Sequence, residues 1–395
     1  MEKRVRNLSF ISDKIELSEE QFQERRFDMI KIKAAVTNAK SEPFQIQEIN
    51  LDPPKGHEIL VRMVASGVCH TDAAVQHQFI PVPLPAVLGH EGAGIVEEVG
   101  SEVTEFKPGD HVGVSFGFCG VCKNCRSGHP AACINLNKIN FGGIQPDGTT
   151  RISLPDGKKL STFFGQSSFS SHIVVNEAAA VKVEDKDIDL GLIAPIGCGI
   201  QTGAGAVLNV LRPAFGSAIA VFGCGTVGMS AIMAARIAGC EKIIAVGGNP
   251  KSLELALELG ATHTINRKET DDIVGTIHEI TDGGCDYAID TSGNADFVKK
   301  MLGSVGFLGK GVILGATGEV TFDIQNELMG DFKSLLGVVE GDAIPKLFIP
   351  KLIEYYKQGR FPIDKLIKFY PFEQINEAME ASSRGECIKA VVRMD

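Results

Sequence analysis

The chain has 395 residues, a length that predicts two domains of ordinary size, each with room for a hydrophobic core. Apolar residues account for 44% and charged residues for 22% of the chain, a composition typical of a folded globular protein. The net charge of −10 argues against nucleic acid as a partner, because binding phosphates requires a basic face. No apolar run reaches the roughly 18 residues of a membrane span.

Residues 1–28 are expected to form an N-terminal extension, because the pattern of a folded core starts at Ile30. This segment mixes basic and acidic residues throughout and lacks the apolar centre of a secretory signal. The 10 cysteines of the chain, without such a signal, indicate metal binding rather than disulfides. We therefore expect a cytoplasmic protein with no membrane partner.

Residues 29–199 have the pattern of a β-rich domain. Apolar and β-branched residues bounded by turn residues predict strands at 58–65 and 111–114. Turn residues dominate 134–161, which predicts a long loop with short hairpins, and such loops often border sites.

The pattern changes over residues 200–340, where short continuous apolar runs alternate with helical patterns. Strands that are buried on both faces of a parallel sheet have this appearance, so the segment predicts a doubly wound α/β domain. Over 341–395 the chain is expected to return to the first domain, through a helix at 345–358 and a strand at 390–393. The predicted strands of the doubly wound domain are 218–222, 242–246, 287–290 and 311–314, and its helices include 252–259 and 271–280.

A glycine-rich turn links the first strand of the doubly wound domain to the helix that follows it. Gly223, Gly225 and Gly228 have the spacing of the dinucleotide-binding fingerprint. The first glycine allows a tight turn, the second lets the backbone approach a pyrophosphate, and the third permits close helix packing. Since the helix N-terminus then faces the diphosphate, the turn with its Thr226 and Val227 is predicted to bind NAD or NADP.

The next strand ends at Gly247, a position where an acid usually binds the ribose hydroxyls of NAD. Without the acid there is no charge to repel a 2′-phosphate, and Lys251 offers a cation that can pair with one. We therefore expect the segment with Gly247, Asn249 and Lys251 to favour NADP over NAD. The alternative is a tolerated loss of the acid in a protein that still uses NAD.

Four cysteines lie close together with the spacing Cys-x2-Cys-x2-Cys-x7-Cys. Four thiolates make up the composition of a closed tetrahedral zinc site, which has no open position for chemistry. We expect this zinc to fold the local lobe, so that chelation would loosen the lobe first. The four residues are Cys119, Cys122, Cys125 and Cys133.

A second metal site is predicted around Gly89-His90-Glu91, which lies at a glycine turn. Taken alone, this histidine has a simpler interpretation as a hydrogen-bonded structural residue. Cys69 upstream and Cys198 downstream change that interpretation, because together they supply one imidazole and two thiolates. Three protein ligands with an open fourth position define a catalytic zinc site.

These motifs, in their order and spacing, resemble those of the zinc-dependent medium-chain alcohol dehydrogenases over residues 30–395. The resemblance implies a GroES-like β-rich catalytic domain joined to a Rossmann coenzyme domain. Within the family the chain is similar to the bacterial benzyl- and aryl-alcohol dehydrogenases, in segments such as 81–85, 164–169, 199–205 and 336–341.

The resemblance also implies roles around the metal. Glu91 would be a carboxylate able to replace water on the metal transiently, and Asp72 would orient the histidine ligand. Thr71 would accept the hydroxyl proton of the substrate. Many members carry a histidine for the proton relay where this chain has Ala74, so the end of the relay stays open. The catalytic zinc would be held by Cys69, His90 and Cys198.

On the coenzyme side, His70 and Lys389 would approach the pyrophosphate. Val227 would pack behind the nicotinamide ring, and Thr202 would lie beside it. The resemblance further implies a homodimer or homotetramer, with the edge of the coenzyme domain around 311–339 pairing subunits.

The expected reaction is hydride transfer between NAD(P) and a primary aromatic, allylic or terpenoid alcohol or its aldehyde, with two zinc ions per chain. A glutathione-dependent formaldehyde dehydrogenase is the first alternative, although it would need basic residues in the cleft. A non-catalytic zinc-binding module is a remote alternative. The apolar substrate pocket implied by the resemblance comprises Ile80, Phe116, Phe163, Phe164, Ala316 and Val339.

Overall fold

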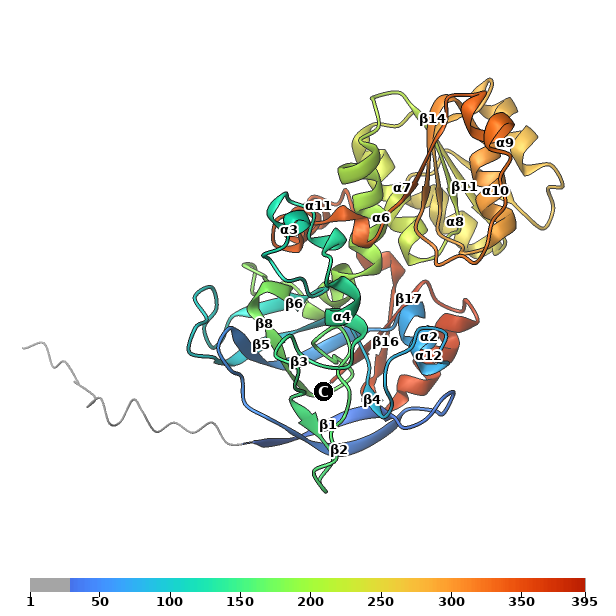
Figure 1. Cartoon of the computed structure of the whole chain (residues 1–395). Coiled ribbons are helices and arrows are strands. Elements are labelled where there is room, and N and C mark those ends of the chain that lie inside the picture. The colour runs from blue at the N-terminus through green and yellow to red at the C-terminus, as the bar shows by residue number, and fades with distance from the viewer. Residues whose placement is uncertain (1–28, 395) are drawn as a thin grey trace, which may run out of the picture.

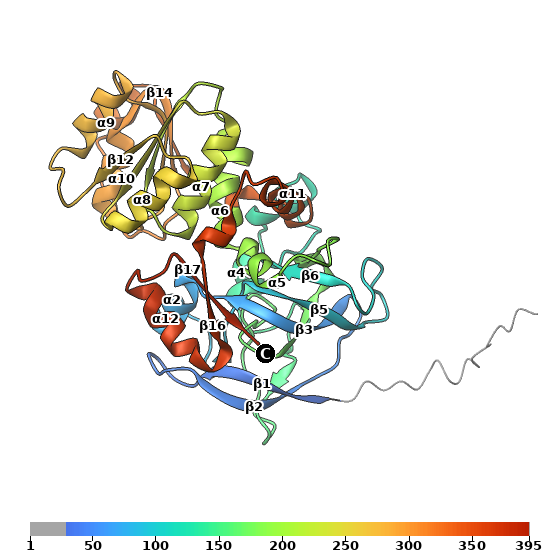
Figure 2. The ribbon, with the colours of Figure 1, turned by 180° about the vertical axis from the view of Figure 1, so that it is seen from behind.

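The computed structural model describes residues 29–394, and the predicted N-terminal extension 1–28 lies outside them. The chain forms two lobes, one built on largely antiparallel sheets and one on a parallel sheet with helices on both faces (Figure 1). In both views, α6 (Gly199–Gly205) and α7 (Thr226–Ala238) lie where the lobes meet (Figure 2).

The first lobe contains two sheets. In the four-stranded sheet the order is β4-β1-β2-β7. In the seven-stranded sheet the order is β16-β17-β3-β5-β6-β9, with β8 also paired to β3. The strands are β1 (Ile30–Thr37), β2 (Gln45–Leu51), β3 (Glu58–Gly67), β4 (Ala86–Val87), β5 (Gly92–Val99), β6 (His111–Val114), β7 (Ile152–Ser153), β8 (His172–Asn176), β9 (Ala180–Lys182), β16 (Ile367–Pro371) and β17 (Lys389–Arg393).

The second lobe is a six-stranded sheet of order β12-β11-β10-β13-β14-β15, and every pairing in it is parallel. Its strands are β10 (Ala218–Phe222), β11 (Lys242–Gly247), β12 (His263–Asn266), β13 (Cys285–Asp290), β14 (Val305–Ile313) and β15 (Ser334–Gly337). Its helices, besides α7, are α8 (Pro250–Leu259), α9 (Ile273–Thr281) and α10 (Ala295–Gly303).

Strand β10 shows why this sheet is buried on both sides. Its residues Ile219 and Val221 join the core that includes α7 and α8. The alternate residues Ala220 and Phe222 join the core that includes α9 and α10. Since successive side chains of a strand point to opposite faces, a continuously apolar strand requires helices on both faces. The predicted doubly wound lobe is therefore confirmed.

Short helices surround the first lobe and the junction. They are α2 (His70–Gln76), α3 (Lys123–Arg126), α4 (Leu136–Phe141), α5 (Leu190–Ile193), α11 (Pro345–Lys357) and α12 (Ile375–Ser383). At the junction α6 crosses α7 so closely that a Cβ at Gly203 would collide with the carbonyl oxygen of Val227. Glycine therefore sets how near the two helices can approach.

The end of the chain lies in the first lobe, because β17 pairs antiparallel with β3, as Val391 with Gly67. The prediction of a loop over 134–161 was wrong in part, since α4 lies within it. Helix α4 forms because Ile139 packs inward and the buried Asn140 amide donates to the carbonyl of Gly117. Those are tertiary contacts that turn residues in the sequence do not reveal.

Within residues 29–394 no single helix is long and apolar enough to cross a membrane. One bent pair of helical segments, Leu190–Gly197 with Gly199–Leu211, passes that test by length and composition alone.

Candidate active site and metal centres

The fold brings together the residues predicted around His90. The ligand atoms of Cys69, His90, Glu91 and Cys198 all lie within 4.8 Å of one another. Cys69 precedes α2, His90 follows β4, and Cys198 precedes α6, so three separate elements aim at one point. His90 and Glu91 are fully buried.

Asp72 fixes the orientation of the histidine. Its Oδ1 lies 3.1 Å from Nδ1 of His90 and accepts a hydrogen bond from the Gly89 amide at 3.0 Å. Its Oδ2 accepts from the Cys69 amide at 3.0 Å. In the neutral ring, with Nδ1 donating to Asp72, Nε2 carries no proton, and this buried atom has no hydrogen-bond partner within residues 29–394. A buried imidazole nitrogen facing two sulfurs fits a metal ion.

The two thiols of this set interact directly. A hydrogen bond with Cys198 lowers the pKa of Cys69 well below its ordinary value, in spite of burial. The same hydrogen bond, together with burial, raises the pKa of Cys198. On a metal, both sulfurs would be thiolates.

Glu91 and Lys389 form a buried ion pair behind the metal set. The Lys389 ammonium lies 2.9 Å and 2.8 Å from the two Glu91 oxygens and donates to the Val68 carbonyl at 2.9 Å. Burial raises the pKa of Glu91 to about 7, although Lys389 acts to lower it. The structure therefore shows Lys389 paired with Glu91. The contact of Lys389 with the coenzyme pyrophosphate stays a prediction.

Aromatic rings cover the histidine. The Phe164 ring stacks on the His90 ring at 4.5 Å between centroids, and the Phe163 ring meets it edge-on at 5.3 Å. Phe164 adopts a φ of +52°, a left-handed conformation that is rare for an aromatic residue. Held strain of this kind is typical of functional sites.

The predicted substrate residues divide between buried and exposed positions. Phe116, Phe163 and Phe164 are buried in the first lobe. Ile80 is half-buried, whereas Ala316 is exposed and Val339 is 57% exposed. The three phenylalanines thus supply an apolar wall, and the pocket as a whole stays a prediction.

A buried polar network that the sequence did not reveal lies next to Cys198. Gln201 Nε2 lies 3.1 Å from a carboxylate oxygen of Glu340 and 2.7 Å from both Ser115 Oγ and the Gly197 carbonyl. The same Glu340 oxygen accepts from the Thr202 hydroxyl at 3.4 Å. Burial raises the pKa of Glu340 to about 7, against the hydrogen bond from Gln201. Glu340 and Gln201 are 139 residues apart, so only the fold brings them together.

The four predicted cysteines of the lobe also meet, with their sulfurs within 4.8 Å of one another. Backbone amides point at the sulfurs, as Cys125 N does at Cys122 Sγ at 3.5 Å. That amide is the main cause that lowers the pKa of Cys122 to about 6. His129 ties the lobe to the second half of the chain, because its Nδ1 lies 2.8 Å from Asp342. The set fits a closed four-thiolate metal site.

The glycine fingerprint lies between β10 and α7, as predicted. A Cβ at Gly228 would collide with the Gly223 carbonyl, so close helix packing requires this glycine. Gly225 precedes the first turn of α7, and a Cβ there would meet nothing within 4 Å. This open face at a helix N-terminus fits a diphosphate.

The fingerprint adjoins the metal set. A Cβ at Gly199 would lie 3.7 Å from Val227 Cγ2 and 3.8 Å from Glu91 Oε1. The Thr226 hydroxyl donates to the Ile388 carbonyl at 2.8 Å, beside β17. His70 is exposed at the start of α2. A coenzyme on the fingerprint would therefore extend towards the metal set.

The predicted coenzyme-selecting residues lie at the end of β11 and directly after it. Gly247 is buried, and the Asn249 side chain caps α8 by accepting from the Lys251 amide at 3.1 Å. Lys251 is exposed. The position of the missing acid thus lies at the carboxyl end of the strand, where adenosine binds in doubly wound folds.

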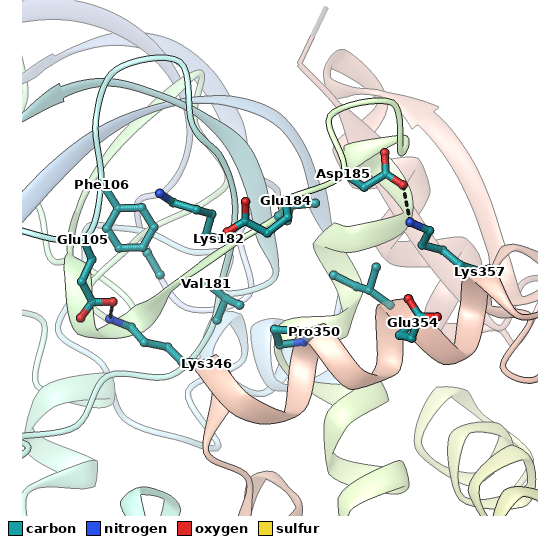
Figure 3. Close-up of a pocket in the computed structure, with 13 residues that line it drawn as sticks. Glu105, Phe106, Val181, Lys182, Glu184, Asp185, Lys346, Pro350, Glu354 and Lys357 are labelled. Carbon is teal, nitrogen blue, oxygen red and sulfur yellow. Dashed lines mark hydrogen bonds and ion pairs between the residues drawn. The ribbon is translucent and has the colours of Figure 1, made fainter.

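A separate cavity of about 520 Å³ lies between β9 and α11, and none of the predicted site residues lines it (Figure 3). Ion pairs cross its mouth, Lys346 with Glu105 at 2.7 Å and Lys357 with Asp185 at 2.8 Å. Surface ion pairs stabilise the wall of this cavity, and the residues that line it include no cluster of metal-binding side chains.

A dinucleotide-binding lobe joined to a lobe with a buried imidazole and two thiols defines a metal-dependent dehydrogenase.

Comparisons with known proteins identify the family. Residues 55–185 match the alcohol dehydrogenase GroES-like domain, and residues 226–354 match the zinc-binding dehydrogenase family. Geraniol dehydrogenase of Castellaniella defragrans is 42% identical, over 92% of this chain and 98% of that protein. The crystal structure of benzyl alcohol dehydrogenase from Acinetobacter calcoaceticus is similar at 44% identity, with a TM-score of 0.89, over 93% of this chain and 100% of that chain.

A third relative is the probable S-(hydroxymethyl)glutathione dehydrogenase 1 of Schizosaccharomyces pombe, 38% identical over 93% of this chain and 98% of that protein. The chain therefore belongs to the zinc-dependent medium-chain alcohol dehydrogenase family. The predicted GroES-like and Rossmann fold and the predicted class of enzyme are confirmed.

Proposed function

We propose that this dehydrogenase oxidises primary aromatic, allylic or terpenoid alcohols, or reduces their aldehydes. The observation that carries this proposal is the aromatic wall at the metal set, where Phe164 stacks on His90 and Phe163 packs edge-on. Flat rings and prenyl chains bind well to such surfaces. The named substrates of two relatives, geraniol and benzyl alcohol, are of this kind.

Several side chains near the metal set would each have a separate role in the reaction. Cys69, His90 and Cys198 hold the catalytic zinc, which when bound supplies Lewis-acid stabilisation of an alkoxide. Thr71, whose hydroxyl lies 3.6 Å from Cys69 Sγ, takes the alcohol proton at Oγ1. Asp72 keeps His90 in the metal-binding tautomer.

The proton leaves Thr71 by a route other than a side chain at position 74, since Ala74 has no proton-carrying group. Glu91 stays beside the ligands as an acid that could enter the metal shell, held back by Lys389. Val227 and Thr202 would hold the nicotinamide, which when bound supplies the hydride acceptor, and Thr202 is in turn positioned by Glu340.

NADP is the preferred coenzyme in this proposal, and each chain holds two zinc ions. The coenzyme preference is supported by the absence of an acid at Gly247 and by the exposed Lys251. The second zinc is supported by the four cysteines of the lobe, whose sulfurs gather around one point.

The enzyme assembles as a homodimer or homotetramer through the edge of its parallel sheet. Strand β15 is the last strand of that sheet. Large apolar side chains near this edge are exposed, among them Phe307 at 73% and Phe332 at 71%. Exposed strand edges and apolar patches favour pairing with a second copy. We also propose a cytoplasmic location and a domain division at 29–199, 200–340 and 341–395.

The S-(hydroxymethyl)glutathione dehydrogenases are the second candidate, because two yeast relatives carry that name. Their substrate bears carboxylates and would need cations in the cleft. Lys389, a cation beside the metal set, is already paired with Glu91. The observations on the cleft therefore favour the aromatic or terpenoid alcohol.

Initial rates of reduced-nicotinamide formation test the proposal, with benzyl alcohol, geraniol, and formaldehyde plus glutathione as substrates, each with NAD and with NADP. We expect turnover of the first two, with NADP ahead, and two zinc ions per chain by elemental analysis. Activity confined to formaldehyde plus glutathione would contradict the substrate proposal, and light scattering in the same buffer measures the oligomer.

A further inference from the structure

A second cation lies beside the position of the missing acid. Strand β12 pairs with β11 so that Asn266 is opposite Gly247. Arg267 follows directly, and its amide donates to the Gly247 carbonyl at 2.8 Å. The neighbouring strand thus delivers Arg267 to the carboxyl end of β11, where the adenosine ribose binds in this fold.

Gly248, at this end of β11, makes room for the guanidinium. A Cβ at Gly248 would lie 2.7 Å from Arg267 Nε and 3.3 Å from its Cζ. The arginine therefore occupies the space that a side chain at position 248 would take. Gly247 also lacks a side chain, so the charge at this edge comes from Arg267 and not from an acid.

The charge of Arg267 is not neutralised within the protein. Among residues 29–394, neither Arg267 nor Lys251 takes part in an ion pair, and both side chains are exposed. The guanidinium carbon lies 5.3 Å from the centre of the Phe297 ring, which supports one face of the planar group. Its N–H edge remains available to an anion.

We infer that Arg267 is the residue that selects NADP over NAD, by binding the 2′-phosphate with its guanidinium while Lys251 adds a second cation. The planar fork of arginine donates two parallel hydrogen bonds to a phosphate. This inference rests on the proposed coenzyme preference and names the side chain responsible for it. Position 267 lies outside the fingerprint and outside the 247–251 segment that the sequence indicates.

Calorimetric binding to the zinc-loaded enzyme tests the inference without turnover. The two probes are adenosine 2′,5′-bisphosphate and adenosine 5′-monophosphate, which differ only in the 2′-phosphate. The wild type should bind the bisphosphate more tightly. In Arg267→Ala that preference should fall by about tenfold or more, because a charge-assisted contact is lost. Affinity for the monophosphate should be unchanged, which also shows that the variant is folded.

Lys268→Ala is the matched control, since it removes the same charge one residue further along the chain. Equal losses in Arg267→Ala and Lys268→Ala would overturn the inference, because general surface charge would then explain the preference. A preference kept in Arg267→Ala would overturn it as well, while leaving the proposed use of NADP intact. Equal binding of both probes by the wild type would instead contradict the NADP preference itself.

Discussion

The Lys389 ammonium lies 2.8 Å from a carboxylate oxygen of Glu91, and both side chains are almost completely removed from solvent. A Cβ at Gly67 would collide with the same carboxylate, so glycine in β3 leaves the space that the pair needs. The cation balances an acid that stands beside two thiols. The pair is thus part of what makes a charged metal set tolerable in the protein interior.

Replacing Lys389 with methionine should lower the free energy of unfolding by about 3–5 kcal/mol, because it leaves Glu91 buried without its partner. Urea unfolding of the zinc-loaded protein measures the change. Lys357→Met is the control, since its ion pair with Asp185 is at the surface, where solvent screens the two charges, and its loss should change the free energy of unfolding far less. Equal losses in the two variants would contradict a special role for the buried pair.

Glu340→Gln should change how stability depends on pH. Burial, opposed by the Gln201 hydrogen bond, raises the pKa of Glu340 from 4.5 to about 7. Because the folded-state pKa is the higher one, the stability contributed by this group is complete below pH 4.5 and is lost as the pH rises through 7. The variant cannot ionise, so its stability relative to the wild type should increase between about pH 5 and about pH 8. Urea unfolding across that range measures the difference, and a flat difference would disprove the assignment.

Cys198→Ser should remove the catalytic zinc and lower kcat by on the order of a thousandfold or more, since Lewis-acid stabilisation is lost. Elemental analysis should then find one zinc per chain, while coenzyme binding followed by nicotinamide fluorescence should persist. Cys285→Ser offers the comparison, because Cys285 is buried and belongs to neither cysteine set. Unchanged activity in Cys198→Ser would remove this residue from the metal site.

Cys122→Ser should lower the yield of folded protein rather than the kcat of the protein that does fold. Its sulfur accepts from the Cys125 amide and lies 3.4 Å from Cys125 Sγ, so its loss opens the four-thiolate set. Hydrogen exchange should increase first within the lobe and then at Asp342, which His129 contacts. A well-folded variant that keeps two zinc ions would contradict the closed site.

Gly247→Asp should shift the coenzyme preference towards NAD, because the new carboxylate repels a 2′-phosphate. The new Cβ would also lie 2.9 Å from Cys224 Sγ and 3.0 Å from Leu253 Cδ2. Gly247→Ala separates the two effects, since it brings the Cβ without the charge. The ratio of kcat/KM for NADP and NAD should fall in the aspartate variant and stay nearly constant in the alanine variant, and equal ratios in both would exclude a charge effect.

Features that depend on a few adjacent residues could be predicted from the sequence. The four-cysteine spacing, the fingerprint at Gly223 and the turn at His90 each carry their chemistry locally. The residues that contact Glu340 and Arg267 could not be predicted from the sequence. They lie on other helices and strands, and which of these come close depends on the strand order and on how the helices cross. A basic residue immediately after the third strand of a doubly wound sheet was the one available signal for Arg267.

The placement of β17 has a consequence for how the enzyme is made. Lys389 bonds to Val68, 321 residues earlier in the chain, and β17 completes the sheet that carries the metal-binding loops. On the ribosome the whole coenzyme lobe is synthesised before this strand exists, and a doubly wound lobe can fold by itself as it emerges. The catalytic lobe therefore cannot complete its fold until β17 has been synthesised and Lys389 neutralises Glu91. Until then its thiols stay accessible. Zinc loading is accordingly expected to be a late event in the biogenesis of this enzyme.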